Sequence, residues 1–372
     1  MRNASPGAAA DDGDLVTLAD IRLAAERVRG VALRTPLLPF GPGDPDDPRG
    51  RARAWLKPES LQPVGAFKIR GAYNAIAQLP AEQAAAGVVT HSSGNHAQGV
   101  ARAARLLGVR AVIVMPDNAP SIKVERVRAD GAEIVFVGAS SEERAERAAA
   151  LVESEGLSLV APFDDARVIA GQGTVGLEIV EQVEELDAAP TGDQGDEVPE
   201  APGLTVLVPI GGGGIASGVA TAVKALRQDA AVFGVEPELA ADARDSLREG
   251  RLVRWEPELV GRTIADGMRS TQVGRLPFAH LSRYLDGVVT VGEDEIATAM
   301  ARAADDARLV LEPSGATALA AWLFHGSELP AGRRVVCVLT GGNVDPERWT
   351  ELVARGRARA TYREAAARSA GV

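Results

Sequence analysis

The chain has 372 residues, 46% hydrophobic and 24% charged, so it is long enough to bury a large core and form two domains. Its formal net charge is −11 and its Lys and Arg residues are scattered, which argues against a nucleic-acid partner. The N-terminus lacks an apolar run, and no stretch approaches the ~18 apolar residues of a membrane span, so we expect a cytoplasmic protein without a membrane partner.

Short β-branched runs alternate along the chain with longer Ala- and Leu-rich segments of helical period. This alternation predicts an α/β protein with a mostly parallel sheet. The expected strands are 87–92, 110–115, 133–138, 204–210, 230–236, 287–291 and 333–340. Helices are expected between them, for example over 96–108 and 218–228.

Two segments are too polar to order themselves. Residues 1–13 are small and acidic, and residues 186–203 combine acids, prolines and glycines with almost nothing apolar. Such compositions cannot bury enough apolar surface to offset the entropy of folding. We expect a disordered N-terminus and a disordered surface insertion.

Four glycines, Gly211, Gly212, Gly213 and Gly214, join the strand expected at 204–210 to an apolar helix. A backbone without Cβ atoms can approach an anion closely, and a helix N-terminus adds a partial positive charge, so the segment predicts a phosphate site. The alternative is a tight strand-to-helix turn. Gly211, Gly213 and Ala216 also satisfy the G-x-G-x-x-A dinucleotide fingerprint, with Glu236 as its ribose-binding acid.

A second strand-to-helix junction, "THSSGNHAQG" at 90–99, is rich in small polar residues. Hydroxyls, backbone N–H groups and an amide at a helix start suit a carboxylate, although Ser93 or Asn95 could simply cap the helix. A dinucleotide site has no evident use for this second anion site. A dinucleotide site also has no evident use for Lys68, which lies in the turn-rich segment "PVGAFKIRGA".

Six motifs occur in a fixed order: "KPESLQPVGAFKIRGA", "THSSGNHAQGVA", "VPIGGGGIASGVA", "TIADGM", "EPSGA" and "LTGGNVD". With them the chain resembles, over about residues 15 to 345, the fold type II (β-family) pyridoxal-phosphate enzymes. The match is closest to the threonine/serine dehydratase and serine racemase branch. The resemblance implies a tryptophan-synthase-β-like α/β fold, in which two open lobes hold the cofactor in their cleft.

The resemblance also implies lobe limits and an assembly. The small mobile lobe spans 87–156, the large lobe 14–86 plus 157–360, and residues 361–372 form a C-terminal tail. Relatives are usually homodimers or homotetramers, so we expect a homo-oligomer.

Most cofactor contacts follow from the same resemblance. Lys68 would form the Schiff base with pyridoxal 5′-phosphate, and a lysine suits this because burial lowers its pKa. Phe67 would pack beside the pyridine ring, Asn95 would hydrogen-bond its 3-hydroxyl, and the four glycines would hold the phosphate.

Two further residues are expected near the pyridine nitrogen. Thr340 occupies a position where this branch usually has serine, and its neutral hydroxyl cannot supply the proton that an aspartate would, which favours β-elimination. Glu312 lies near the same end of the ring in relatives.

The substrate would be a small amino acid. Its carboxylate would lie in the loop that contains Ser92, Ser93, Asn95 and His96, and Arg144 aligns with an arginine that contacts the carboxylate in racemases. Lys68 would remove the Cα proton. Ser93 would be a second acid–base group on the opposite ring face, as in serine racemases.

These roles favour a threonine/serine dehydratase, an ammonia-lyase that converts L-threonine or L-serine to 2-oxobutanoate or pyruvate plus ammonia. Ser93 leaves serine racemase or dual activity as an alternative, and a hydroxyaspartate dehydratase is a further one. A dinucleotide-binding regulator built on the glycine loop is the non-enzymatic alternative.

A divalent-cation site is also suggested. Glu236, the carbonyl of Ala240 and Asp242 match the spacing of the cation site in the serine racemase group. Two carboxylates and a carbonyl are hard oxygen ligands suited to Mg²⁺ or Ca²⁺. The alternative is a solvated acidic turn.

Overall fold

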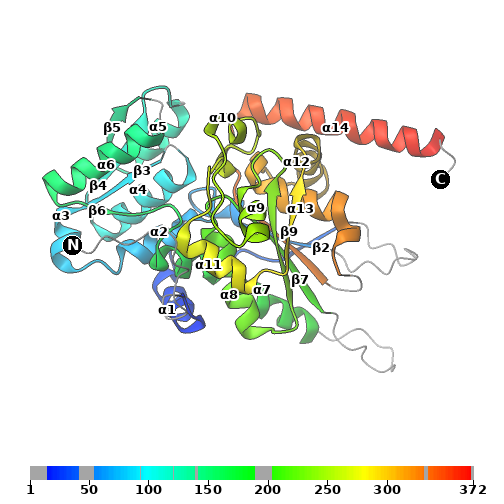
Figure 1. Ribbon diagram of the computed structural model, residues 1–372, viewed down its shortest axis with the longest axis horizontal. Coiled ribbons are helices and arrows are strands. Elements are labelled where there is room, and N and C mark those ends of the chain that lie inside the picture. The colour runs from blue at the N-terminus through cyan, green and yellow to red at the C-terminus, as the bar shows by residue number, and fades with distance from the viewer. Residues whose placement is uncertain are drawn as a thin grey trace.

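The computed structural model describes residues 15–41, 54–92, 94–119, 121–138, 141–188, 203–330 and 334–369. These residues form two sheets, each covered by helices on both faces (Figure 1). The predictions of disorder for 1–13 and for most of 186–203 concern residues outside this description. Residues 186–188, however, form the last turn of a helix, so the predicted start of the insertion is wrong.

The larger sheet contains six strands. In sheet order they are β1 (Leu38–Phe40), β2 (Ala54–Pro58), β10 (Arg334–Leu339), β7 (Leu204–Pro209), β8 (Ala231–Pro237) and β9 (Gly287–Val291). Only the β1–β2 pair is antiparallel. The helices and 3-10 turns of this part are α1 (Leu18–Val28), η2 (Glu59–Leu61), α2 (Lys68–Ile76), α7 (Ala166–Ala188), α8 (Gly214–Leu226), α9 (Asp242–Glu249), α10 (Pro257–Val260), η3 (Asp266–Met268), α11 (Arg275–Tyr284), α12 (Glu293–Ala307), α13 (Pro313–His325), η4 (Gly326–Glu328) and α14 (Pro346–Ser369).

Both faces of the larger sheet are buried, because its central strands are continuous apolar runs whose side chains alternate between two cores. On β10, Val336 and Val338 point to the core under α7 and α8. Cys337 and Leu339 point to the opposite core, under α12 and α13. The strand composition therefore explains the helix–sheet–helix layering.

The smaller sheet contains four parallel strands, in the order β5 (Glu133–Val137), β4 (Ala111–Pro116), β3 (Val88–His91) and β6 (Ser158–Leu159). Its helices are α3 (Ala81–Ala86), α4 (Asn95–Leu107), α5 (Ser121–Ala129) and α6 (Ser141–Glu155). They gather on one side of the molecule, apart from the larger sheet (Figure 1). β6 lies just beyond residue 156, the expected end of the small lobe.

All seven predicted strands are present, with ends that differ by at most one residue. Sequence reasoning missed β1, β2 and β6, which are short or interrupted by a charged residue. The helix α14 continues to Ser369, past the expected start of the tail. In the part of the chain described here, no helix is long and apolar enough to cross a membrane.

Candidate active site

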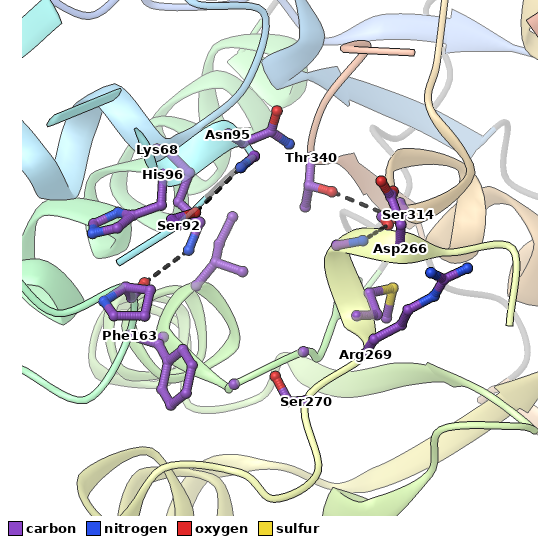
Figure 2. Close-up of a pocket in the computed structure, with 18 of the residues that line it drawn as sticks. Lys68, Ser92, Asn95, His96, Phe163, Asp266, Arg269, Ser270, Ser314 and Thr340 are labelled. Carbon is purple, nitrogen blue, oxygen red and sulfur yellow. Dashed lines mark hydrogen bonds between the residues drawn. The ribbon is translucent and has the colours of Figure 1, made fainter. Parts of the chain in front are cut away.

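A cavity of about 330 Å³ opens where strands of both sheets end (Figure 2). The residues that follow β3, β7 and β10 at their carboxyl ends line it, among them Ser92, Gly211 and Thr340. In open parallel sheets, ligands bind beyond the carboxyl ends of the strands. The cavity therefore lies where this architecture favours a ligand site.

Lys68 is the first residue of α2, and its amine points into the cavity (Figure 2). The backbone before it is held to the end of β10, since the Phe67 N–H donates to the Thr340 carbonyl at 3.1 Å. Nζ of Lys68 donates to the Pro162 carbonyl at 2.7 Å and lies 5.0 Å from the centre of the Phe67 ring. Burial lowers the pKa of this amine to about 8. A minority of the amine is thus neutral near physiological pH, far more than for an ordinary lysine, and this neutral form is the one that a nucleophile or base requires.

The glycine loop lines the cavity beside Phe163 and begins α8. Gly213 has φ +93°, in the left-handed region that favours glycine, and no side chain caps the helix. A Cβ on Gly212 would lie 2.1 Å from the Phe163 ring, so no larger residue fits. The first N–H groups of α8 have no partner within the helix, and they offer an anion site with the positive end of the helix dipole.

A second helix also begins at the cavity without a capping side chain. The N-cap of α4 is Gly94, which excludes Asn95 as the N-cap, and the Gly94 N–H donates to Ser92 Oγ at 3.3 Å. Ser93 lies outside the described residues, so its predicted catalytic role stays a prediction. The cavity therefore contains two helix N-termini that suit two separate anionic groups.

His96 lines the cavity, but its ring is turned toward the smaller sheet. Nε2 of His96 lies 2.9 Å from the Val160 carbonyl, which can only accept, so this nitrogen carries the proton. Burial, and secondarily the charge of Lys68, lowers the pKa of His96 to about 3. The imidazole is neutral, which makes its backbone N–H the better candidate for an anion contact.

Glu312 is the N-cap residue of α13, and its side chain is buried at the cavity wall. Oε1 of Glu312 accepts a hydrogen bond of 2.6 Å from Nδ2 of Asn95. Burial, followed by the charge of Asp266, raises the pKa of Glu312 to about 8. The carboxyl group is therefore protonated at neutral pH. Thr340 lies on the same wall, and its Oγ donates a long hydrogen bond of 3.4 Å to the Ser314 carbonyl.

Arg144 comes from α6 and lines the same cavity, while its predicted contact with a substrate carboxylate stays a prediction. Burial lowers its pKa, and its charge contributes to the lowered pKa of His91. All candidate cofactor and substrate residues that the structure describes thus line one cavity: Phe67, Lys68, Ser92, Asn95, His96, Arg144, Gly211, Gly212, Gly213, Gly214, Glu312 and Thr340.

The three candidate cation ligands lie elsewhere, between β8 and α9. Glu236 accepts from the backbone N–H groups of Ala243 at 3.0 Å and Arg244 at 2.8 Å, and so caps α9. Glu236, Ala240 and Asp242 are all buried, so the alternative of a solvated turn is wrong. Among the described residues, no group of three or more His, Cys, Asp or Glu side chains could hold a metal.

Sequence reasoning missed part of the cavity. The motif "TIADGM" was visible, yet the contributions of Asp266, Arg269 and Ser270 from η3 and its C-terminal flank emerge only in the fold (Figure 2). Phe163 had no sequence signal, because it reaches the glycine loop only through tertiary packing. The same is true of Asn343 in "LTGGNVD", which contacts Asn95 across 248 positions of the chain.

Comparisons with known proteins identify the family of the chain. A family model for pyridoxal-phosphate dependent enzymes matches residues 28–341. The L-threo-3-hydroxyaspartate ammonia-lyase of Saccharomyces cerevisiae is 36% identical over 337 residues, which cover 91% of this chain and 96% of the relative. The L-threonine ammonia-lyase of Thermotoga maritima is 38% identical over 343 residues, 92% of this chain and 79% of the relative.

Solved structures show the same relationship. The structure of maize serine racemase superposes with a TM-score of 0.79 at 35% identity, covering 93% of this chain and 99% of the maize chain. The predicted fold class is confirmed. Relatives with three different activities are similarly distant, so similarity alone does not select one of them. The chain belongs to the pyridoxal-phosphate-dependent enzymes of fold type II, in the branch that contains threonine dehydratases and serine racemases.

Proposed function

We propose that this protein is a pyridoxal-phosphate-dependent ammonia-lyase that eliminates water from L-threonine or L-serine. One observation carries the proposal: the amine of the half-buried Lys68 lies in a cavity onto which two uncapped helix N-termini open. The N-terminus of α8 suits the cofactor phosphate and that of α4 suits the substrate carboxylate. The amine lies in the same cavity, where an aldehyde and then an amino acid must react.

The residues present fit the cofactor. Lys68 would hold its aldehyde carbon, the four glycines would bind its phosphate, and Phe67 would pack beside its ring. Asn95 would donate to the ring oxygen, and Thr340, with Glu312 close by, would face the ring nitrogen. When bound, the cofactor supplies an electron-withdrawing ring that makes the substrate Cα proton acidic. A neutral hydroxyl at position 340 keeps that withdrawal moderate, which favours early loss of a β-substituent.

The protein residues then have two tasks. The loop from Ser92 to His96, with Arg144, would hold the carboxylate and orient the Cα–H bond toward Lys68. The Lys68 amine would take the Cα proton, since its pKa of about 8 is matched to neutral pH. The proton and the β-hydroxyl leave as water. Hydrolysis of the remaining C–N bond gives a 2-oxo acid and ammonia.

A second candidate is 3-hydroxyaspartate ammonia-lyase activity. Lys123, Arg144 and Arg269 all line the cavity, and they would favour a substrate with a second carboxylate. A relative with this activity is also among the most similar proteins. The racemase alternative depends on Ser93, whose position lies outside the described residues.

We also propose a Mg²⁺ or Ca²⁺ ion at Glu236, Asp242 and the Ala240 carbonyl. Support comes from Oδ2 of Asp242, which is buried without a hydrogen-bond partner. Burial, and then the charge of Asp242, raises the pKa of Glu236 well above its usual range. A bound cation would relieve this repulsion. The lobe limits, the homo-oligomer and the cytoplasmic location stay predictions.

The function is tested by incubating the cofactor-loaded protein separately with L-threonine, L-serine, L-threo-3-hydroxyaspartate and D-serine. Release of 2-oxo acid and chirality of the remaining amino acid are followed together. We expect the fastest 2-oxo acid release from L-threonine or L-serine. D-serine formed from L-serine with little pyruvate would contradict the proposal, and fastest turnover of hydroxyaspartate would establish the second candidate instead.

A further inference from the structure

The loop after β10 carries a side chain, Asn343, that the proposed mechanism leaves unused and that contacts one residue of the cavity wall, Asn95. Asn343 donates from Nδ2 to the Val64 carbonyl at 2.7 Å and to Oδ1 of Asn95 at 2.8 Å. Its own Oδ1 accepts from Nη1 of Arg126 at 2.6 Å. Asn343 thus joins α5 of the smaller sheet, the loop before Lys68 and the residue proposed to contact the cofactor ring.

The absence of a side chain at Gly65 leaves room for the Asn343 side chain. Gly65 has φ +70°, and a Cβ there would lie 2.4 Å from Oδ1 of Asn343. The two loops are held together by a hydrogen bond of 2.9 Å from the Gly342 N–H to the Gly65 carbonyl. A glycine at 65 is therefore required both by the backbone and by the space that Asn343 occupies.

The partners determine which way the Asn343 amide points. A guanidinium has only donors, so the atom facing Arg126 is the amide oxygen. A backbone carbonyl only accepts, so the atom facing Val64 is the NH₂ group. Two independent contacts give the same orientation, although oxygen and nitrogen of an amide are otherwise hard to distinguish.

The orientation of Asn343 then determines that of Asn95. Because Asn343 presents an N–H, the Asn95 atom that meets it is an oxygen, and the Asn95 NH₂ group must face Glu312 and the cavity. Glu312 alone would not ensure this. Its protonated carboxyl group can accept from the Asn95 NH₂ group or donate to the Asn95 oxygen, so it is compatible with either orientation of the amide. One N–H of Asn95 binds Glu312 at 2.6 Å, and among the described residues the second has no acceptor.

We infer that Asn343 is a positioning residue that holds the Asn95 amide with its NH₂ group toward the cavity, and that Arg126 and Val64 fix Asn343 in turn. The inference rests on the proposed function, since the acceptor for the second N–H is the ring oxygen of the bound cofactor. An N–H donor stabilises that oxygen as an anion, whereas an amide oxygen in the same place repels the anion.

The test is Asn343→Asp, which replaces both donors by acceptors at nearly constant size and keeps an acceptor for Arg126. The new carboxylate repels Oδ1 of Asn95, so the Asn95 amide turns and presents its oxygen to the cavity. In protein loaded with pyridoxal 5′-phosphate, absorption spectra across a pH series report the ratio of ionised to protonated ring oxygen. We expect the ratio to fall on the order of tenfold to a hundredfold, as expected for losing a hydrogen bond to a charged group.

The Asn95→Ala background separates positioning from general damage. Without the Asn95 amide, Asn343→Asp should shift the spectrum no further, and Asp345→Asn in the same loop should shift it in neither background. An unchanged spectrum in Asn343→Asp, or an equal shift in the Asn95→Ala background, would overturn the inference. If Asn343→Asp does not fold, Asn343→Ala replaces it in both backgrounds. We then expect a smaller spectral shift in the same direction, and again no further shift in the Asn95→Ala background.

Loading is checked in each variant by borohydride reduction and peptide mapping of the cofactor on Lys68. A wild-type chain that takes up no cofactor on Lys68 would contradict the proposed function itself. Wild-type loading with an unshifted Asn343→Asp spectrum would overturn only the role of Asn343.

Discussion

Two groups of buried or half-buried charges meet at α2, which carries Lys68 of one group and Arg70 of the other, and they differ in one respect. The paired cluster contains Lys57, Glu59, Arg70 and Glu178, and every charge in it meets an opposite charge. The cavity contains Lys68, two residues before Arg70, and no carboxylate in the described part of the chain binds its amine. Both groups are shielded from solvent, but only the charges of the paired cluster have partners of opposite charge.

The pKa values of Arg70 and Glu59 follow this difference, whereas burial outweighs the partners of Lys57 and lowers its pKa. Burial lowers the pKa of Arg70, but Glu59 and Glu178 outweigh it and raise that pKa. Burial raises the pKa of Glu59, but Arg70 outweighs it and lowers that pKa. In the cavity burial acts with little compensation, and the pKa values of Lys68 and Glu312 both move to about 8. The unpaired groups Lys68 and Glu312 therefore mark the chemical site, and the ion pairs of Arg70 mark the frame that holds it.

The largest expected effect is on the frame. Arg70→Met would leave Glu59 buried without its main partner, which typically costs about 3–5 kcal/mol of unfolding free energy. Urea unfolding measures this. Arg110→Met is the matched control, because its pairs with Glu133 and Glu155 are exposed and worth less than about 1 kcal/mol. Equal losses of unfolding free energy in the two variants would contradict the distinction between buried and exposed ion pairs.

Lys68→Met, unlike Arg70→Met, should raise the unfolding free energy of the cofactor-free protein. A lysine whose pKa falls from 10.5 to about 8 destabilises the fold below pH 8, and this penalty fades as the pH rises toward 10.5. The variant should gain on the order of 1–2 kcal/mol at pH 7, discounted for solvent in the cavity, yet lose at least about 10³-fold in activity. A loss of stability comparable to that of Arg70→Met would contradict this account.

Glu312→Gln tests the other unpaired group through pH. The folded-state pKa of Glu312 is about 8, above its usual 4.5, so its contribution is fully present below pH 4.5 and is lost as pH rises through 8. The unfolding free energy of the variant should therefore fall less between pH 5 and 8 than that of wild type. A difference on the order of 1–3 kcal/mol is expected, and parallel pH profiles would contradict it.

The smallest effect concerns the proposed cation. Burial raises the pKa of Asp242 to about 7, so protons compete with a cation below that pH. Saturating CaCl₂ or MgCl₂ should raise Tm by a few degrees at pH 8 and by less at pH 6. Asp242→Asn should abolish the increase. An equal increase in Asp242→Asn would place the cation elsewhere.

Local patterns predicted much of this molecule. The seven predicted strands are apolar runs, most of them buried, and the glycine loop and Lys68 lie in short motifs whose chemistry is readable without the fold. β2 could not be predicted because Lys57 interrupts it, and the residue that compensates this charge, Glu178, lies 121 positions away. The contacts of Phe163 and Asn343 are likewise tertiary. Sequence therefore located the reactive groups, while their pairing and orientation required the structure.

The central claim is that an unpaired amine, and not burial alone, makes Lys68 the reactive lysine. Lys57 is the internal comparison, since its buried amine binds Glu178, Gln182 and the Thr35 carbonyl. The protein should be incubated with pyridoxal 5′-phosphate, reduced with borohydride and mapped by peptide mass. We expect one cofactor per chain, on Lys68, and none on Lys57. Cofactor spread over several lysines, or absent from Lys68, would contradict the account.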